Sequence, residues 1–509
     1  MLFDYDSKST QSILNYAKKL EGKTFRDILN VYEKSDSKSY EKPKSNFVHL
    51  NSSIGMNAKA KGQLGSFLEM YYFGYGPNSK QEADFAKTGV ELKTTCVNQL
   101  KSGELSAGER LSITNISFSE PVEENFFKSH LFNKINKLLL VHYLRNKKIN
   151  RLDNTILFVN MFNFASEKSN ESDCCGIIKL PKKDLKIILD DYNTIIQKIK
   201  AGKAHELSES DTLYLGAATK GSTAEESIRP QFYGDHIPAK KRNFCFKRQY
   251  MDYILKQYIL KNNDCYESIL PINCYDSKNI SFEEYTTNKI NNYAGKTDEE
   301  LCYEFNREYN NNKAQWSDLA YRILGIKSSK AEEFIKANIV VRSIRLEENG
   351  KNKESIPLPT INFIEFSNET WENSKLLDYL ETTRFLFVIY RKQGNHYILT
   401  GSKFWNMPYN DLHFTVKDGW IKTQKIINEG VVFTPIEQNG NLILSNNLPK
   451  KTDNEIIHIR PHAQKRAYKL KNGISIGNLK DADKLPDGQW MTIQSFWINN
   501  DYILKQIIK

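Results

Sequence analysis

Hydrophobic and polar residues follow two different periods along this chain. Apolar positions recur at helical spacing over residues 64–72, which predicts a helix with one buried face. Residues 154–160 and 385–390 instead form short apolar runs that are typical of buried strands. Both kinds of segment occur in each half of the chain, so the pattern predicts an α/β or α+β fold in which helices flank a mixed central sheet.

The pattern also repeats along the chain. The hexapeptide at 252–257, Asp-Tyr-Ile-Leu-Lys-Gln, recurs without change at 501–506, and the strand-like run at 138–143 has a parallel at 385–390. Coincidence among common helix and strand patterns is the alternative. Several matches in the same order nevertheless favour a duplicated domain.

Length and charge agree with two domains and suggest a partner. At 509 residues the chain exceeds the size at which one hydrophobic core usually stops growing. The repeat sets a first domain at 1–257, a linker at 258–284 and a second domain at 285–509. Lysine and arginine outnumber aspartate and glutamate by 72 to 61, for a formal net charge of +11, which favours a polyanionic partner.

Cysteine usage and the N-terminal residues indicate the cellular setting. The seven cysteines show no C-x-x-C spacing, so neither a disulfide framework nor a zinc site is expected. The N-terminus lacks a basic segment followed by an apolar core, and the aliphatic runs are short. We therefore expect a cytoplasmic protein without a signal peptide or a membrane span.

One short segment carries the residues that phosphodiester hydrolysis needs. Residues 90–94 alternate as a strand does, so Glu91 and Lys93 point to the same face. Asp84 precedes them, and Gly89 permits a tight turn that folds Asp84 back beside Glu91. Converging carboxylates can hold Mg²⁺ against a phosphate oxygen, while a nearby amine stabilises charge and helps to deprotonate water. This is the minimal core of a nuclease, although the bare spacing also arises by chance in charged chains.

A longer ordered motif surrounds this core: Lys61-Gly62, Gly65, Leu68-Glu69, Gly74, Asp84-Phe85 and Gly89 through Thr94. It resembles the segment that defines the MutH mismatch-repair endonuclease and the MutH-like type II restriction endonucleases that cut at GATC. The resemblance implies two tandem restriction-endonuclease-like domains of the PD-(D/E)xK class, Mg²⁺ as cofactor, no organic cofactor, and double-stranded DNA as substrate. It also implies roles for single residues: metal ligands at Asp84 and Glu91, a catalytic lysine at Lys93, a helix-borne acid at Glu69, and a lysine near the cleft at Lys61.

Two residues of the motif, Ala83 and Glu69, leave room for another interpretation. Ala83 stands where the wider nuclease superfamily often has proline, a departure that touches no functional group. Glu69 could instead be a solvated helix residue. Its helix is otherwise rich in apolar residues, which favours a place in the site.

Two segments are candidates for reading DNA. Residues 457–463 resemble the MutH loop in which an Arg-Pro-Lys sequence enters the major groove, whereas residues 215–220 keep the lysine but not the Arg-Pro. A solvated surface is the alternative for the basic run at 240–248, but its interleaving with aromatic residues fits a half-buried strand with one charged face. We expect a base contact from Lys220 and phosphate contacts from Lys241, Arg242, Lys247 and Arg248 in the first half, and DNA contacts from Arg460, His462 and Lys465 in the second.

The second half has lost part of the catalytic set. A constant offset between the repeats assigns counterparts as follows: Asp318 to Glu69, Glu333 to Asp84, Val340 to Glu91, and Arg342 to Lys93. Valine cannot ligate Mg²⁺, and arginine is a poor proton acceptor. We therefore expect a catalytically silent second domain that binds DNA as an effector, and DNA held there could promote a dimer.

Two other functions compete with a restriction endonuclease. A mismatch-repair nicking enzyme is one, but such enzymes resemble single-domain proteins, and the duplication argues against it. A non-enzymatic DNA-binding regulator is the other, and it leaves the intact set of Asp84, Glu91 and Lys93 unexplained.

Overall fold

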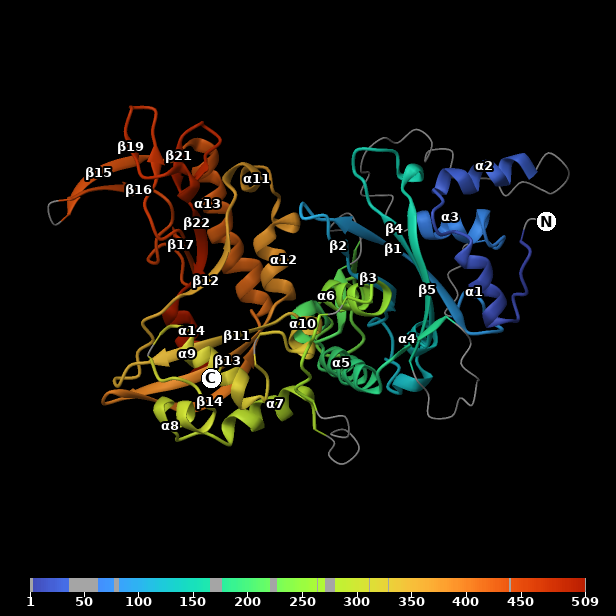
Figure 1. The fold of residues 1–509 in the computed structure, drawn as a ribbon, viewed down its shortest axis with the longest axis horizontal. Coiled ribbons are helices and arrows are strands. Elements are labelled where there is room, and N and C mark those ends of the chain that lie inside the picture. The colour runs from blue at the N-terminus through green and yellow to red at the C-terminus, as the bar shows by residue number, and fades with distance from the viewer. Residues whose placement is uncertain are drawn as a thin grey trace. The chain divides into compact units, whose positions relative to one another are not determined.

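The computed structural model describes residues 3–35, 63–76, 82–164, 176–219, 227–262, 264–270, 280–310, 312–327, 329–438 and 441–508. The chain divides into two compact units (Figure 1). Unit 1 comprises Met1–Phe282 with Lys330–Asn338, and unit 2 comprises Glu283–Ser329 with Ile339–Lys509. No helix within the described ranges is both long and apolar enough to span a membrane.

Unit 1 contains two sheets. The mixed central sheet has the order β2-β1-β4-β5-β6, in which β1 pairs in parallel with β4 and β4 pairs antiparallel with β5. A smaller antiparallel sheet has the order β3-β10-β7. The strands are β1 (Val90–Gln99), β2 (Leu105–Ala107), β3 (Leu111–Ile116), β4 (Lys137–Leu144), β5 (Ile156–Phe164), β6 (Ile177–Leu180), β7 (Leu215–Thr219) and β10 (Arg242–Phe246), with a short pair β8 (Ile228–Arg229) and β9 (Ala239–Lys240) before β10.

Helices cover the central sheet of unit 1. In Figure 1, α1, α2 and α3 lie on one side of β1, β4 and β5, and α5 and α6 lie on the other. Apolar residues from α1 to α3 share a core with Leu92 of β1 and Leu139 of β4. The helices are α1 (Thr10–Lys18), α2 (Phe25–Ser35), α3 (Gln63–Tyr71), α4 (His130–Ile135), α5 (Lys182–Lys200), α6 (Arg248–Tyr253) and α10 (Glu332–Ala337).

Unit 2 repeats the strand order of unit 1 and adds to it. Its central strands are β11 (Ile339–Leu346), β13 (Arg384–Gln393) and β14 (His396–Trp405), and its second sheet has the order β12 (Ile356–Thr360), β22 (Gln494–Ile498), β17 (Ile457–Pro461). The additions are a hairpin, β15 (Phe433–Gln438) and β16 (Asn441–Asn446), and a sheet of four short strands, β18 (Tyr468–Lys469), β19 (Ser475–Ile476), β20 (Ala482–Lys484) and β21 (Trp490–Thr492). The helices are α7 (Phe282–Asn291), α8 (Asp298–Glu304), α9 (Gln315–Ile323), α11 (Phe363–Ser367), α12 (Lys375–Thr382), α13 (Lys417–Glu429) and α14 (Asn500–Ile508).

Corresponding strands of the two units also pair in the same direction. In unit 1, β1 pairs in parallel with β4, and β4 pairs antiparallel with β5. In unit 2, β11 pairs in parallel with β13, and β13 pairs antiparallel with β14. The helix before each second strand starts in the same way: the Ser129 and Ser374 hydroxyls accept hydrogen bonds from backbone N–H groups in the first turns of α4 and α12. Side-chain caps of this kind fix where a helix begins.

The secondary structure predicted from periodicity is confirmed. The helix expected over 64–72 is α3, and the strands expected at 90–94, 154–160 and 385–390 lie in β1, β5 and β13. The mixed α/β architecture with helices flanking the sheets is also confirmed.

The compact units differ from the predicted domain boundaries. The described part of the predicted linker packs within unit 1, where Ile269 and Leu270 are buried. The segment 330–338, assigned from sequence to the second domain, also belongs to unit 1. The physical reason is a fully buried ion pair, because Nζ of Lys336 in α10 lies 2.8 Å from both carboxylate oxygens of Asp184 in α5.

The buried ion pair makes a prediction about stability. Lys336→Ala is expected to destabilise unit 1 by about 3–5 kcal/mol, because Asp184 would be left as an uncompensated buried acid. Lys186→Ala, which breaks the partly exposed pair with Asp190 on the same helix, is the control and should cost only about 0–1 kcal/mol. Hydrogen exchange in peptides of α5 measures both effects. Equal protection in the two variants would contradict the structural role of α10.

Candidate active site

Strand β1 presents a carboxylate and an ammonium side by side. Leu92 is buried in the core shared with α3, so Glu91 and Lys93 face the other side of the strand. Glu91 is only 1% exposed. Nζ of Lys93 lies 2.5 Å from Oε1 of Glu91, which gives this buried carboxylate one cationic partner. The same-face placement expected from the sequence is therefore present.

A tight turn brings Asp84 to Glu91. The backbone N–H of Phe85 donates to the carbonyl of Val90 at 2.9 Å, and Gly89 adopts a φ of +69°, a conformation that glycine reaches without strain. The N–H of Asp84 donates to Oε2 of Glu91 at 3.2 Å, and Oδ2 of Asp84 accepts from the N–H of Leu92 at 2.8 Å. The return of Asp84 onto the strand is as the sequence predicted.

Helix α3 supplies Glu69 to the same place. A Cβ on Gly65 would lie 3.2 Å from Oγ1 of Thr94, so glycine lets the helix approach β1 closely. Burial, followed by the negative charge of Asp84, raises the pKa of Glu69 to about 7, while the ammonium of Lys93 opposes the rise. Glu69 therefore belongs to the cluster and is not a solvated helix residue.

Lys134 is a member of the site that the sequence reasoning missed. It lies on α4, is 8% exposed, and its Nζ donates to both carboxylate oxygens of Glu91 at 3.0 and 3.1 Å. It also reaches the carbonyl oxygen of Glu82 at 3.3 Å. The only sequence signal is a lysine on the apolar side of a short helix, next to Leu131 and Ile135, just before a buried strand.

A phenol group is the second addition to the site. The hydroxyl of Tyr75 is buried and has no hydrogen-bond partner among the described residues. Burial, then the charge of Asp84 and that of Glu69, raises the pKa of this phenol. Its ring packs edge-on against Phe85, the neighbour of Asp84, at a centroid distance of 5.3 Å. An unsatisfied polar atom at this place can be satisfied by water or by a bound ligand.

The charge balance of the site favours a cation. Burial, followed by the charge of Glu91, raises the pKa of Asp84 to about 6. Three acids share the site with two lysines, and a divalent cation would relieve their repulsion. No set of three or more His, Cys, Asp or Glu side chains within the described ranges is placed to hold a metal. Mg²⁺ nevertheless fits the pair Asp84 and Glu91, because it is commonly held by one or two carboxylates with water and phosphate completing its coordination.

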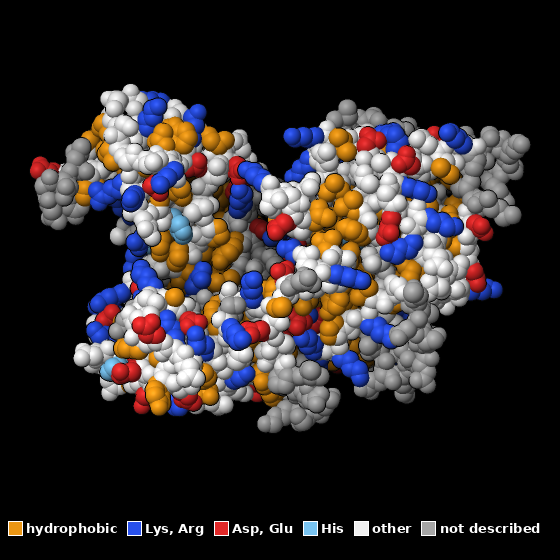
Figure 2. Space-filling model, in the orientation of Figure 1, with side chains coloured by type: hydrophobic (Ala, Val, Ile, Leu, Met, Phe, Trp, Pro, Cys, Tyr) orange, Lys and Arg blue, Asp and Glu red, His pale blue; other side chains and the backbone are white. Residues whose placement is uncertain are grey.

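The residues expected to contact DNA in unit 1 divide into three groups. Lys61 and Lys220 lie outside the described residues. Lys241 is half-buried and Arg248 is exposed, so both remain available to phosphate. On the face shown in Figure 2, lysine and arginine side chains are interspersed with acidic and apolar ones, so net charge alone does not locate a DNA surface.

The prediction of phosphate contacts for Arg242 and Lys247 is wrong. Arg242 in β10 is 2% exposed and Lys247, the N-cap residue of α6, is 0% exposed, because every residue of β10 and the residue that follows it are buried. The guanidinium of Arg242 donates to the carbonyl of Ala217 at 2.7 Å, and Nζ of Lys247 donates to the carbonyl of Thr212. Both side chains therefore form hydrogen bonds inside unit 1 and do not face solvent.

In unit 2 the residues expected to contact DNA are on the surface. Arg460, His462 and Lys465 are exposed at and beyond the end of β17. The guanidinium of Arg460 lies 4.4 Å from the ring centroid of Trp497, and Nδ1 of His462 lies 3.3 Å from Oγ of Ser495. Stacking of this kind holds an arginine fork in place while leaving its N–H groups available.

The catalytic set is absent from the equivalent strand of unit 2. Val340 pairs with Phe385 as Glu91 pairs with Leu138, so valine takes the place of the buried carboxylate. Glu333 is the predicted counterpart of Asp84, but its carboxylate is bound within unit 1. Its oxygens accept hydrogen bonds from the hydroxyl of Ser268 at 2.6 Å and from the N–H of Ile269 at 3.0 Å.

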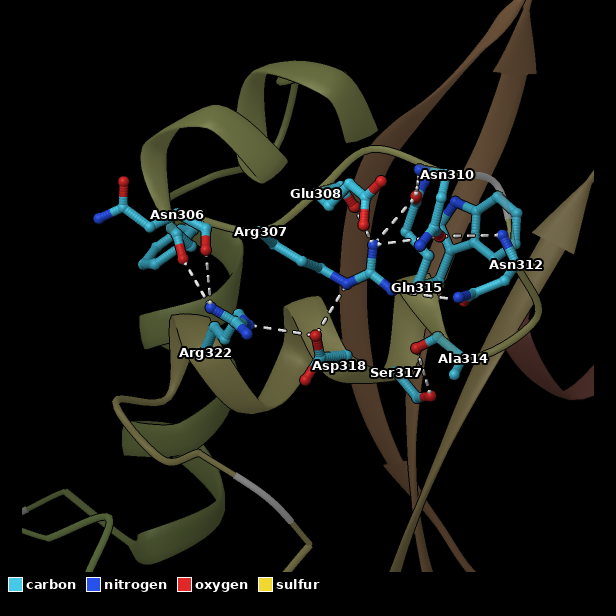
Figure 3. Close-up of polar contacts among 12 residues, drawn as sticks. Asn306, Arg307, Glu308, Asn310, Asn312, Ala314, Gln315, Ser317, Asp318 and Arg322 are labelled. Carbon is cyan, nitrogen blue, oxygen red and sulfur yellow. Dashed lines mark hydrogen bonds and ion pairs between the residues drawn. The ribbon is translucent and has the colours of Figure 1, made fainter.

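The assignment of Asp318 as the counterpart of Glu69 is wrong. The buried positions of α3 are Leu64, Phe67, Leu68 and Tyr71, and those of α9 include Trp316, Leu319, Ala320 and Ile323. This match puts Tyr321 in the place of Glu69. Asp318 is bound by the side chains of Arg307 at 2.8 Å and Arg322 at 3.1 Å (Figure 3).

Fold and site together define a DNA endonuclease of the MutH type. Residues 73–172, which include Asp84, Glu91, Lys93 and Lys134, match the family described as "DNA mismatch repair enzyme MutH". Over 474 residues, 88% of this chain and 93% of the relative, the sequence is 34% identical to the type II restriction enzyme Sau3AI of Staphylococcus aureus. The chain belongs to the MutH-like type II restriction endonucleases and is a site-specific nuclease that acts on DNA.

The raised pKa values predict how stability depends on pH. In the folded state burial raises the pKa of Asp84 to about 6 and that of Glu69 to about 7, well above the ordinary range of a carboxyl group. The stability that this proton binding contributes is present below the unfolded pKa and is lost as pH rises through the folded pKa. Asp84→Asn should therefore raise the unfolding temperature of the metal-free protein at alkaline pH, with a gain that disappears on acidification.

Thermal unfolding across this pH range is the measurement. Asp235→Asn, at an exposed position of the same unit, is the matched control and should follow the wild type at every pH. An Asp84→Asn variant that tracks the wild type would show that the carboxylates do not repel one another.

Proposed function

We propose that this restriction endonuclease cuts both strands of DNA at GATC, that it uses Mg²⁺ held in unit 1, and that unit 2 is a non-cleaving copy of the same domain that binds a second DNA site. The meeting of Asp84, Glu91 and Lys93 on one face of β1 carries the catalytic part. GATC rests on the MutH resemblance of residues 61–95 together with the similarity to Sau3AI over most of the chain.

The chain's own residues have distinct parts in the proposed reaction. Asp84 and Glu91 would hold the metal, which when bound polarises a phosphoryl oxygen and lowers the pKa of water. Lys93 and Lys134 form ion pairs with Glu91, and Lys93, which is more exposed, can also stabilise negative charge on the phosphoryl group. Glu69, whose pKa is raised to about 7, can accept a proton from the attacking water.

The recurrence of the fold supports a duplicated domain. Strands β11, β13 and β14 follow the order and directions of β1, β4 and β5, and the parallel pairs β1-β4 and β11-β13 have the same register. The side-chain cap of the preceding helix is shared as well. Chemistry is not shared, because valine replaces Glu91 and tyrosine replaces Glu69. A copy that keeps the fold and the exposed Arg460, but not the acids, fits a DNA-binding role.

A nicking role is the second candidate, because the matching family is described as a mismatch repair enzyme. Incubation of supercoiled plasmid with Mg²⁺ separates the two functions. Linear fragments whose ends read GATC support the proposal, and accumulation of nicked circles alone would favour the mismatch-repair role.

The first prediction from this mechanism concerns Glu91 and Lys93. Glu91→Ala and Lys93→Ala should each lower the cleavage rate by on the order of 10²-fold to 10³-fold or more, since each removes charge from the reacting centre. DNA affinity should change little. Val340→Ala, the same strand position in unit 2, is the matched control and should cleave at the wild-type rate. Near-normal cleavage by Glu91→Ala would refute the site assignment.

The second prediction concerns the metal. All-oxygen ligation by Asp84 and Glu91 favours Mg²⁺ or Mn²⁺, whereas the larger Ca²⁺ with its looser geometry should support DNA binding without turnover. Plasmid cleavage with each ion as the sole divalent cation is the measurement. Robust hydrolysis with Ca²⁺ alone would contradict the mechanism.

The third prediction concerns the number of recognition sites. If unit 2 tethers a second duplex, a plasmid with two GATC sites should be cut faster than one with a single site, because tethering raises the effective DNA concentration. It could also promote a dimer in which two clefts cut both strands. Arg460→Ala should remove the advantage while leaving single-site cleavage intact. Equal rates on both plasmids would leave unit 2 with a structural role only.

A further inference from the structure

The place of the missing active site in unit 2 holds an arginine. Arg342 pairs with Phe387 in the parallel pairing of β11 and β13, as Lys93 pairs with Leu140 in that of β1 and β4. In unit 1 the ammonium at this position has the carboxylate of Glu91 as its partner. In unit 2 the residue two positions earlier is Val340, which packs against the apolar core. Unit 2 therefore has a basic residue at the position of Lys93 but no acid at the position of Glu91.

The guanidinium of Arg342 has no acidic partner among the described residues. Its Nε is buried and has no hydrogen-bond partner in the described ranges, one terminal nitrogen makes a long contact of 3.4 Å with the carbonyl of Val341, and the hydroxyl of Tyr379 accepts a hydrogen bond from the guanidinium. No acidic side chain in the described ranges forms an ion pair with it. Four other arginines of unit 2 do form ion pairs: Arg345 with Glu354, Arg384 with Glu283, and Arg307 and Arg322 with Asp318.

Two phenols complete the surroundings of Arg342. Burial raises the pKa of Tyr321 in α9 and of Tyr379 in α12, and the positive charge of Arg342 opposes the rise in both. Both rings therefore lie close to the guanidinium. Tyr321 stands where unit 1 has the acid Glu69, so a hydroxyl donor replaces a carboxylate. The site has changed from one that suits a cation to one that suits an anion.

We propose that this site of unit 2 binds a backbone phosphodiester of double-stranded DNA through the guanidinium of Arg342. The inference rests on the proposed DNA binding of unit 2 and names the position at which the backbone is held. A partly buried charge without an acidic partner is costly, and a phosphate that supplies the partner recovers that cost. The guanidinium fork matches two phosphate oxygens, and the phenol hydroxyls can donate to the others. At the position equivalent to the active site of unit 1, unit 2 thus holds a phosphate of the second duplex without cleaving it.

The test measures binding of the full chain to a short duplex containing one GATC, with Ca²⁺ as the divalent cation. Sedimentation gives the number of duplexes bound, and titrations at several salt concentrations give the affinity of the second duplex. The wild type should bind two duplexes. Arg342→Gln should weaken the second binding event by about 10-fold to 100-fold and reduce its salt slope by about one, leaving the first event unchanged. Arg342→Lys should fall between the two.

Arg391→Gln is the matched control, because Arg391 is an exposed arginine of the same sheet whose guanidinium donates to the carbonyl of Glu348 at 3.0 Å. It should bind as the wild type does. Thermal unfolding, followed by the fluorescence of the six tryptophans, which all lie in unit 2, checks folding. Arg342→Gln should not lower the midpoint, since it removes a charge that has no acidic partner in the described part of the chain.

The outcomes are distinguishable. If the wild type binds only one duplex, DNA binding by unit 2 is wrong and the present inference falls with it. If the wild type binds two and Arg342→Gln binds the second as tightly, or no more weakly than Arg391→Gln does, the phosphate site is overturned while the proposed function stands. A marked fall in the unfolding midpoint of Arg342→Gln would make Arg342 a structural residue and would also overturn the site.

Discussion

The structure of the catalytic unit depends on how one buried carboxylate is kept charged. Glu91 is 1% exposed, and a charge taken out of water to that extent needs partners. Lys93 from the same strand, Lys134 from α4 and the N–H of Asp84 supply them. Each partner demands a feature of the fold: the pleat of β1, the parallel pairing that places α4 next to it, and the turn at Gly89. The site is thus assembled around Glu91.

The same constraint links the residues that stand at the equivalent positions of unit 2. Once valine occupies the position of Glu91, an ammonium from α4 and a returning aspartate have nothing to pair with. Glu333, at the predicted place of Asp84, is bound instead by Ser268 and Ile269. Tyr321 at the position of Glu69, and Arg342 without an acidic partner among the described residues, fit the same constraint, because without the central carboxylate the neighbouring positions no longer need to balance its charge.

Much of the fold was accessible from local sequence, and the errors share one cause. Periodicity predicted α3, β1, β5 and β13, and the acid, glycine and strand spacing predicted the return of Asp84, because each depends on nearby residues. Lys134 was missed because it is 43 residues from Glu91 and only strand pairing brings the two together. Arg242 and Lys247 were misassigned because the alternation of charged and aromatic residues cannot reveal that all of β10 and the residue after it are buried.

Asp84, Glu91 and Glu69 form a cluster of acids whose mutual repulsion a divalent cation would relieve. Calorimetric titration of the DNA-free protein with Mg²⁺, at a pH between about 6 and about 7 and in two buffers of different ionisation enthalpy, tests this directly. The pKa of Asp84 is raised to about 6 and that of Glu69 to about 7, so in this range the metal-free site binds protons. We expect Mg²⁺ uptake to release protons and Asp84→Asn to reduce both the uptake and the release. Binding without proton release, or binding unchanged in Asp84→Asn, would show that the acids do not form a metal site.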